Sequence, residues 1–225
     1  LHVSVLNSQF DGWRDHSDSY TTSASVRLSA PLGDKFHLGV LADAVSDVNH
    51  FPGPLTQAQY DSARTQAKAN FVSRDDRRVN KVGRMATTLD GMLDTQTDLH
   101  ITAFAEPKVL QRSERDKLRD FTRYNVGGSA TASRSEAMNG AVTGKTSIGL
   151  DEGYQDGSIH FYSLVNGQRG DELVANKREG SNAFGGFVQQ EITWGGHWSA
   201  RGAVRYDALQ YIAQTFAPKD PDDHT

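Results

Sequence analysis

Arginine side chains concentrate in two polar stretches of the chain, residues 51–80 and 111–123. A guanidinium group donates paired hydrogen bonds to carboxylate or catecholate oxygens, so clustered arginines are suited to holding an anion. If the two stretches converge in space, their arginines would form a cationic funnel for an anionic chelate. The predicted ligand-binding residues are Arg74, Arg77, Arg78, Arg112, Arg115 and Arg123, with Lys117 and Arg119 beside them in the sequence.

A second interpretation is that these arginines pair with carboxylates of the protein itself. Acidic residues are interspersed with the arginines in both stretches, and exposed charges of opposite sign commonly form solvated pairs. A third interpretation is contact with anionic lipopolysaccharide. The carboxylates available for internal pairing are Asp75, Asp76, Glu114, Asp116 and Asp120.

Other chemistry has little support in the sequence. The absence of Cys excludes disulfides and thiolate sites, and the 8 His residues lack the i, i+4 spacing of a helical zinc site. The run "GAVTGKTS" (140–147) is one residue short of a phosphate loop and lies between two expected strands, so a turn is predicted there. No Gly-x-Ser-x-Gly elbow occurs, and neither Asp75-Asp76 nor "DPDD" (220–223) has EF-hand spacing. We therefore predict no enzyme, no cofactor and no metal site.

The composition narrows the class of protein. The hydrophobic fraction is 36%, which is low for a domain that must fill a dry core, whereas Gly is abundant at 21 residues. The net charge of −4 and the lack of a basic tract argue against nucleic acid as a partner. No run approaches the 18 apolar residues of a transmembrane helix, and Leu1 opens directly into strand-like sequence. We expect a chain cut from a longer precursor, or a fragment.

Alternating polarity is the dominant pattern. In "YTTSASVRLSAPLGDKFHLGVLADAVSDVN" (20–49), every second residue is apolar on both sides of a short Pro-Leu-Gly-Asp corner. The pattern recurs along the chain and predicts about nine strands. They cover residues 2–10, two segments within 20–49, 79–89, 99–109, 122–132, 145–164, 184–194 and 198–208 or beyond.

Short and long connections alternate between these strands. The short ones are "PLGD", "GMLDTQ", "EAMNGAVTG" and "GGH"; the longer ones include 111–120, 166–182 and the insertion after residue 50, where a short helix is expected at 56–67. Short turns at one end and long loops at the other are typical of outer-membrane barrels. We predict an all-β, antiparallel up-and-down transmembrane β-barrel, with apolar rows toward lipid and polar rows toward the lumen.

A soluble or surface β-sandwich, for example a carbohydrate-binding module, is the main alternative, because alternation with turns marks sandwiches too. Two features favour the barrel. Greek-key topology does not readily produce alternating loop lengths. The expected inward rows also carry arginines that a dry core would not accept without partners. These are Arg27, Arg84, Arg123, Arg201 and Arg205.

Several blocks of the sequence resemble TonB-dependent outer-membrane receptors. They are "DGWRDHS", "FPGPLTQAQYDSARTQAKANFVSRDDRRVNKVGRMATTLD", "PKVLQRSERDKLRDFTRYNVGGSA" and "GGFVQQEITWGGHWSARGAVRYDALQY". The last is the most specific, because a strand with Gln-Gln-Glu turns tightly into one that ends Arg-Tyr-Asp, here Arg205, Tyr206 and Asp207. The resemblance extends over nearly the whole chain.

The resemblance implies a barrel of 22 strands, filled by an N-terminal plug domain and powered by the TonB complex of the inner membrane. The function implied is active uptake of an iron–siderophore complex or another scarce nutrient across the outer membrane of a Gram-negative bacterium. Lipid and lipopolysaccharide would surround the barrel. No plug and no TonB-contacting segment is found, so residues 1–225 are expected to be an internal part of the barrel that does not transport by itself. A passive porin, which lacks gating, is a third alternative beside the receptor and the sandwich.

Overall fold

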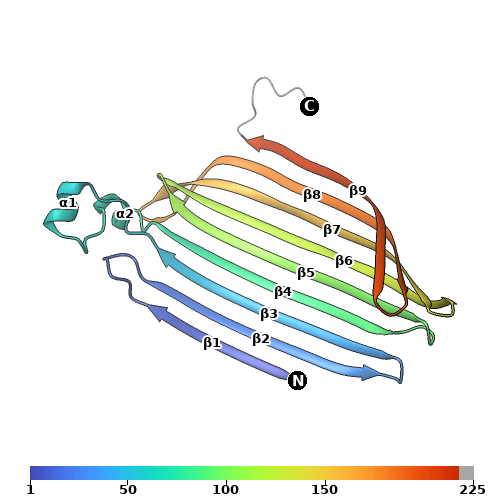
Figure 1. Cartoon of the computed structure of the whole chain (residues 1–225). Coiled ribbons are helices and arrows are strands. Elements are labelled where there is room, and N and C mark those ends of the chain that lie inside the picture. The colour runs from blue at the N-terminus through green and yellow to red at the C-terminus, as the bar shows by residue number, and fades with distance from the viewer. Residues whose placement is uncertain (218–225) are drawn as a thin grey trace.

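The structure, a computed structural model, describes residues 1–217; residues 218–225, with the Asp-Pro-Asp-Asp run, lie outside the described part. Nine strands form one antiparallel sheet in which every strand pairs with the next along the chain (Figure 1). Their bounds are β1 His2–Phe10, β2 Ser19–Leu32, β3 Phe36–His50, β4 Arg77–Met92, β5 Thr97–Glu114, β6 Lys117–Asn139, β7 Val142–Val165, β8 Gln168–Trp194 and β9 Trp198–Ala217. The up-and-down order confirms the predicted fold and is not that of two stacked sheets, although the sheet is not closed within these nine strands.

The two faces of the sheet differ in polarity. One rung of the ladder places Ala132, Ile148, Val188 and Val204 side by side on what we call the apolar face. The side chains of Ile148, Val188 and Val204 are 54%, 51% and 78% exposed. Within residues 1–217, the only buried hydrophobic residues are Leu118, Phe121 and Ile159. Such a broad exposed apolar surface is expected where lipid, not water, covers it.

The opposite, polar face carries paired charges. Arg84 Nε donates to Glu106 Oε2 at 2.8 Å, and Arg201 Nε donates to Glu191 Oε2 at 2.9 Å. Arg205 donates to both oxygens of Asp151, at 2.8 and 2.9 Å. Three of the arginines predicted on inward rows are therefore on this face. Arg84 and Arg201 pair with carboxylates of the adjacent strand, and Arg205 of β9 reaches across β8 to Asp151 of β7.

Two of the predicted long loops are strands instead. β5 continues to Glu114 and β6 starts at Lys117, while β7 and β8 are joined by Asn166 and Gly167 alone. Both two-residue turns have positive φ at each position, the conformation whose twist matches a right-twisted hairpin. β6, β7 and β8 reach 23, 24 and 27 residues, more than a tilted strand needs to cross a bilayer.

The remaining connections at this end are residues 11–18 and the insertion 51–76, which lies beside the ends of β3 and β4 (Figure 1). The insertion holds two short helices, α1 Gln57–Ser62 and α2 Ala69–Ser73. The predicted helix at 56–67 begins where expected, because Thr56 caps it and forms a capping box with Gln59. It ends early, since Ala63 is extended (φ −156°, ψ 101°), and α2 was not predicted.

The opposite end of the sheet has four short turns, at residues 33–35, 93–96, 140–141 and 195–197. The "GGH" turn between Trp194 and Trp198 is as predicted. Gly140 lies in a turn and Lys145 lies in β7, which agrees with the turn expected at "GAVTGKTS". Among residues 1–217, no helix has the length and apolar character needed to span a membrane.

Candidate functional site

The two long connections at the loop end are fastened to each other. Arg14 donates from Nη2 and Nε to the Gln66 carbonyl at 2.8 and 3.1 Å, and from Nη1 to the Gly53 carbonyl at 2.8 Å. The backbone N–H of Asp15 donates to the Thr65 carbonyl at 2.7 Å. These bonds join residues 11–18 and the insertion into one unit at the loop end of the sheet. They also give the backbone carbonyls the hydrogen-bond donors that such groups need when they are shielded from water.

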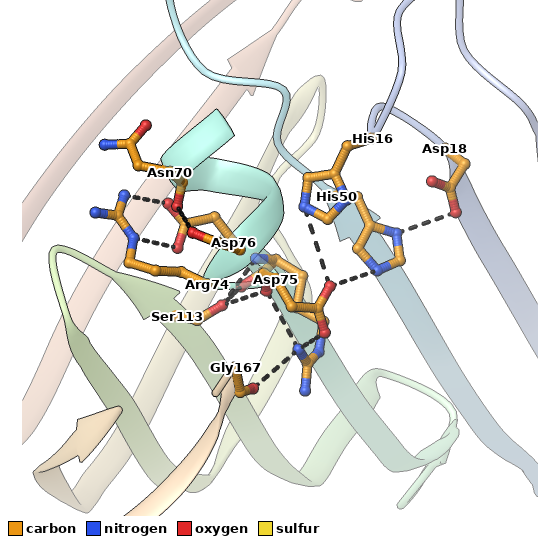
Figure 2. Close-up of polar contacts among 11 residues, drawn as sticks. His16, Asp18, His50, Asn70, Arg74, Asp75, Asp76, Ser113 and Gly167 are labelled. Atoms are coloured by element: carbon orange, nitrogen blue, oxygen red, sulfur yellow. Dashed lines mark hydrogen bonds and ion pairs between the residues drawn. The ribbon is translucent and has the colours of Figure 1, made fainter. Parts of the chain in front are cut away.

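Arg74 is committed to an internal ion pair. Its Nη2 and Nε donate to the two oxygens of Asp76 at 2.6 and 3.2 Å, as Figure 2 shows. Asp76 is only 2% exposed, and Asp116 adds a second carboxylate 3.5 Å from Arg74 Nη1. The hydrogen bonds to Asp76 raise the pKa of the Arg74 guanidinium above its ordinary value. This pair anchors the end of α2 and leaves little of the Arg74 charge for a ligand.

Arg77 ties the insertion to two hairpins. Its Nη1 donates to the Asp75 carboxylate and, at 3.5 Å, to the carbonyl of Gly167 in the β7–β8 turn. Ser113 of β5, 1% exposed, accepts from the Arg77 backbone N–H at 2.9 Å and donates to the Asp75 carbonyl at 2.8 Å. Gly167 has φ +73°, and a Cβ there would come within 3.0 Å of the Asp75 side chain. Residue 167 must therefore be glycine for the β7–β8 turn to approach Asp75 this closely.

Two histidines that are distant in the sequence meet at the same place (Figure 2). His50 Nδ1 lies 3.0 Å from Asp18 Oδ2, and His50 Nε2 lies 3.6 Å from Asp75 Oδ1. His16 Nε2 lies 4.0 Å from the same Asp75 oxygen, and the two imidazole rings are 4.9 Å apart. In the part of the chain that the structure describes, no group of three His, Cys, Asp or Glu residues is arranged to hold a metal ion. The cluster links residues 11–18, β3 and the insertion.

Positive charge accumulates on the polar face just below the insertion. The strand register places Arg78, Arg112 and Arg119 side by side on β4, β5 and β6, and we call these three residues the arginine row. Four residues further along the strands, Lys108 and Arg123 lie opposite each other on the same face. The register thus brings these five basic residues together on one part of the polar face.

Aromatic rings support several of these guanidinium groups. Arg119 lies 5.6 Å from the Phe121 ring and 5.8 Å from the Phe161 ring, within the range of cation–π attraction. Arg123 lies 4.6 Å from the Phe121 ring and donates to Glu179 at 3.3 Å. The Nε atoms of Arg119 and Arg123 are buried without a hydrogen-bond partner among the described residues. The rings hold both cations in place, and Glu179 offsets part of the Arg123 charge.

The structure separates the six predicted arginines into three groups. Arg74 and Arg77 form the internal pairs that the second interpretation predicted. Arg78, Arg112 and Arg123 lie on the polar face, and Arg115 is exposed in the β5–β6 turn. A ligand role for any of them stays a prediction. Asp120 is 3.6 Å from Arg169, which was not among the expected partners.

Lys108 belongs to the same charged surface but was not among the predicted site residues. Arg119 was expected among the cations of the funnel, as a loop residue, and the structure places it in β6, which begins at Lys117. It precedes Arg123 by four positions, so strand parity puts both on one face.

Comparison with known proteins finds the fold but no sequence family. No family model matches the chain, and no curated protein matches it. Among solved structures, the ferric citrate transporter FecA in its unliganded form has a TM-score of 0.75 at 16% identity, over 95% of this chain and 33% of that one. The open form of Fiu, the ferric-catecholate import receptor of E. coli K12, has a TM-score of 0.69 at 11% identity, over 95% and 40% of the two chains. The ferric yersiniabactin uptake receptor FyuA of Yersinia pestis has a TM-score of 0.57 at 8% identity, over 94% and 38%.

These similarities confirm the resemblance at the level of the fold. The chain shares the strand arrangement of these transporters over nearly its whole length and spans between 33% and 40% of theirs. All three are named as transporters, import receptors or uptake receptors.

Proposed function

We propose that this chain is part of the barrel of a TonB-dependent outer-membrane receptor that imports an anionic iron–siderophore complex or a similar scarce nutrient. In this proposal the apolar face contacts the lipid and lipopolysaccharide of a Gram-negative outer membrane. The loop end faces outward and the four short turns face the periplasm, the usual orientation of such barrels. A separate plug domain would fill the lumen, and a segment outside this chain would reach the TonB complex.

The arginine row carries the ligand part of the proposal. Arg78, Arg112 and Arg119 bring like charges together on three neighbouring strands, below loops that are held in a fixed arrangement. Guanidinium groups are good donors to carboxylate and catecholate oxygens, so this part of the polar face is suited to an anionic chelate. FecA and Fiu, which share the fold, are named for ferric citrate and ferric catecholates. The sandwich alternative is not supported by a single sheet of nine strands.

The test is ligand binding to the full-length receptor carrying both Arg78→Gln and Arg119→Gln. We expect the affinity for ferric citrate or a ferric catecholate, whichever the parent receptor binds, to fall by at least about tenfold. A hydrogen bond to a charged group contributes about 1.5–3 kcal/mol, and about 1.4 kcal/mol corresponds to a factor of ten. Equilibrium dialysis with radioactive iron measures the dissociation constant.

The matched control removes the same charge elsewhere on the polar face, by Arg27→Gln with Arg201→Gln. These two positions lie on β2 and β9, away from the insertion, and the control should bind as the parent does. Equal affinities for the parent and the Arg78/Arg119 variant would remove the arginine row from the proposal. A parent receptor that binds neither chelate would contradict the siderophore assignment itself.

A further inference from the structure

A groove of about 600 Å³ crosses the apolar face over β2, β3 and β4, and Lys81 is its one charged lining residue within positions 1–217. The strand register continues the apolar face from Ala132 of β6 through Leu99 of β5 to Gly91 of β4. Lys81 has the same parity as Gly91, so it lies on this face, and it is exposed. A basic side chain therefore borders a groove that the proposed function places against lipid. We call it the Lys81 groove.

The floor of the Lys81 groove consists of small residues. Ala24, Ala44 and Gly83 lie side by side on β2, β3 and β4 and line the groove. Pro107 and Val109 of β5 line it on one side, and a Cβ at Gly83 would lie 3.4 Å from Pro107 Cγ. An acyl chain that enters the groove gains dispersion contacts with this floor. The groove is therefore suited to one acyl chain of a neighbouring lipid.

A polar rung closes the groove on the side of the loop end. Its members lie side by side on β1, β2, β3 and β4, and they are Asn7, Thr22, Ser46 and Lys81. Toward the short turns, every apolar-face position of residues 24–32 and 36–44 is Ala, Val, Leu or Phe. Each of these stretches matches the 9–11 residues with which a tilted strand crosses the hydrocarbon layer. The polar rung therefore marks the outer boundary of that layer, and Lys81 stands at the level of the lipid headgroups.

The orientation of the sheet identifies these headgroups. The loop end faces outward in the proposed function, and the outer leaflet of a Gram-negative outer membrane consists of lipopolysaccharide. Its lipid A part carries phosphate groups on a sugar backbone. A Lys side chain buries its aliphatic stem along apolar surface and extends its ammonium to the interface, where it binds phosphate as a point charge. Within residues 1–217, no carboxylate forms an ion pair with Lys81.

We propose that the Lys81 groove binds one lipopolysaccharide molecule, with an acyl chain over Ala44 and Gly83 and a lipid A phosphate on Lys81. The Lys81 ammonium donates to the phosphate oxygens. The hydroxyl groups of Thr22 and Ser46, on the same rung, are donors and acceptors for the hydroxyl groups of the sugar. The inference rests on the membrane location and the orientation in the proposed function, not on the nutrient that the receptor imports.

The experiment is photocrosslinking from the rim of the groove. The full-length receptor carries the photoreactive residue p-benzoylphenylalanine in place of Val109, which lies opposite Lys81 on β5. It is mixed in detergent with equal amounts of diphosphoryl lipid A, the same lipid A without its phosphates, and phosphatidylglycerol, and intact-mass measurement identifies the attached lipid. We expect diphosphoryl lipid A to exceed the dephosphorylated form by about fivefold, because one Lys at an anionic membrane surface contributes about 1 kcal/mol.

Two variants separate the headgroup contact from the acyl-chain contact. Lys81→Gln should bring the ratio of the two lipid A forms to about one, whereas Ala44→Phe should lower the yield of both forms by filling the groove. Lys81 and Ala44 are both exposed, so neither change should prevent folding. Lys108→Gln is the matched control, because Lys108 is next to Val109 but points to the polar face. It should leave the ratio at about fivefold, whatever its effect on chelate binding.

Each part of the proposal has its own contradicting result. A ratio that survives in Lys81→Gln, or a parent without a preference for the phosphates, would overturn the phosphate contact. Unchanged yields in Ala44→Phe would overturn the placement of the acyl chain, and phosphatidylglycerol that crosslinks as strongly as diphosphoryl lipid A would overturn lipopolysaccharide as the occupant. A receptor that is monodisperse without detergent and crosslinks to no lipid would instead contradict the proposed membrane location. Loss of ferric-chelate binding with an unchanged lipid ratio would affect the proposed ligand alone.

Discussion

Val188→Arg in the full-length receptor is expected to destabilise the folded barrel by about 2–4 kcal/mol, the cost of an arginine on the lipid face at mid-bilayer. Val188 lies on the apolar face beside Ile148 and Val204, and its side chain is 51% exposed. It precedes Gly195 in the short β8–β9 turn by 195 − 188 = 7 residues, well inside the membrane-crossing part of the strand. Reversible unfolding by denaturant in lipid vesicles measures the change in the free energy of unfolding.

Gln189→Arg is the control for this prediction, because Gln189 is the next residue of β8 and points to the polar face. Arginine is already common on that face, so Gln189→Arg should change the free energy of unfolding far less than Val188→Arg. Similar losses for the two variants would show that lipid does not cover the apolar face. The assignment of the two faces, and the proposed membrane location, would then be wrong.

Alternation predicted the strands only where the two sides of the sheet meet different media. Residues 184–194 alternate clearly and were predicted as strand, whereas residues 168–182 of the same β8 were expected to be loop. Polar residues such as Asp171, Glu172 and Lys177 occur on this extension without regard to parity. In the proposed orientation this extension lies outside the bilayer. Both of its faces then contact water, so the alternation between apolar and polar residues is lost.

The turn chemistry contained the information that the polarity pattern lacked. Asn166-Gly167 is a dipeptide strongly favoured in two-residue hairpin turns, and both residues have positive φ. It therefore indicated a tight hairpin between β7 and β8. Arg115-Asp116 adopts the same conformation with a less typical pair of residues, so its turn was harder to predict.

The candidate site was predictable in composition but not in arrangement. The clustering of arginines was visible in the sequence, but the side-by-side placement of Arg78 and Arg112 depends on the register between β4 and β5. That register is set by pairing along the whole hairpin. The meeting of His16 and His50 depends on how residues 11–18 fold against the insertion, and no local pattern encodes such a contact.

Asp76→Asn is expected to loosen the insertion by about 3–5 kcal/mol, the usual cost of removing one partner from a buried ion pair. Asp76 is 2% exposed and Arg74 is 18% exposed by side chain, so the remaining guanidinium would be largely desolvated. Asp116, 3.5 Å from Arg74, compensates in part and favours the lower end of this range. Amide hydrogen exchange of the full-length receptor measures the effect locally, without requiring the barrel to unfold.

The expected readout lies at two amides that close the insertion. The Phe51 N–H donates to the Asp76 carbonyl and the Asp76 N–H donates to the Phe71 carbonyl, both at 2.9 Å. A loss of about 3 kcal/mol corresponds to exchange on the order of a hundredfold faster in peptides that contain them. Asp116→Asn, at a carboxylate that is 81% exposed, should accelerate exchange less than about fivefold, because exposed pairs contribute at most about 1 kcal/mol. Unchanged exchange in Asp76→Asn would mean that the Arg77, Ser113 and Arg14 contacts hold the insertion without the buried pair.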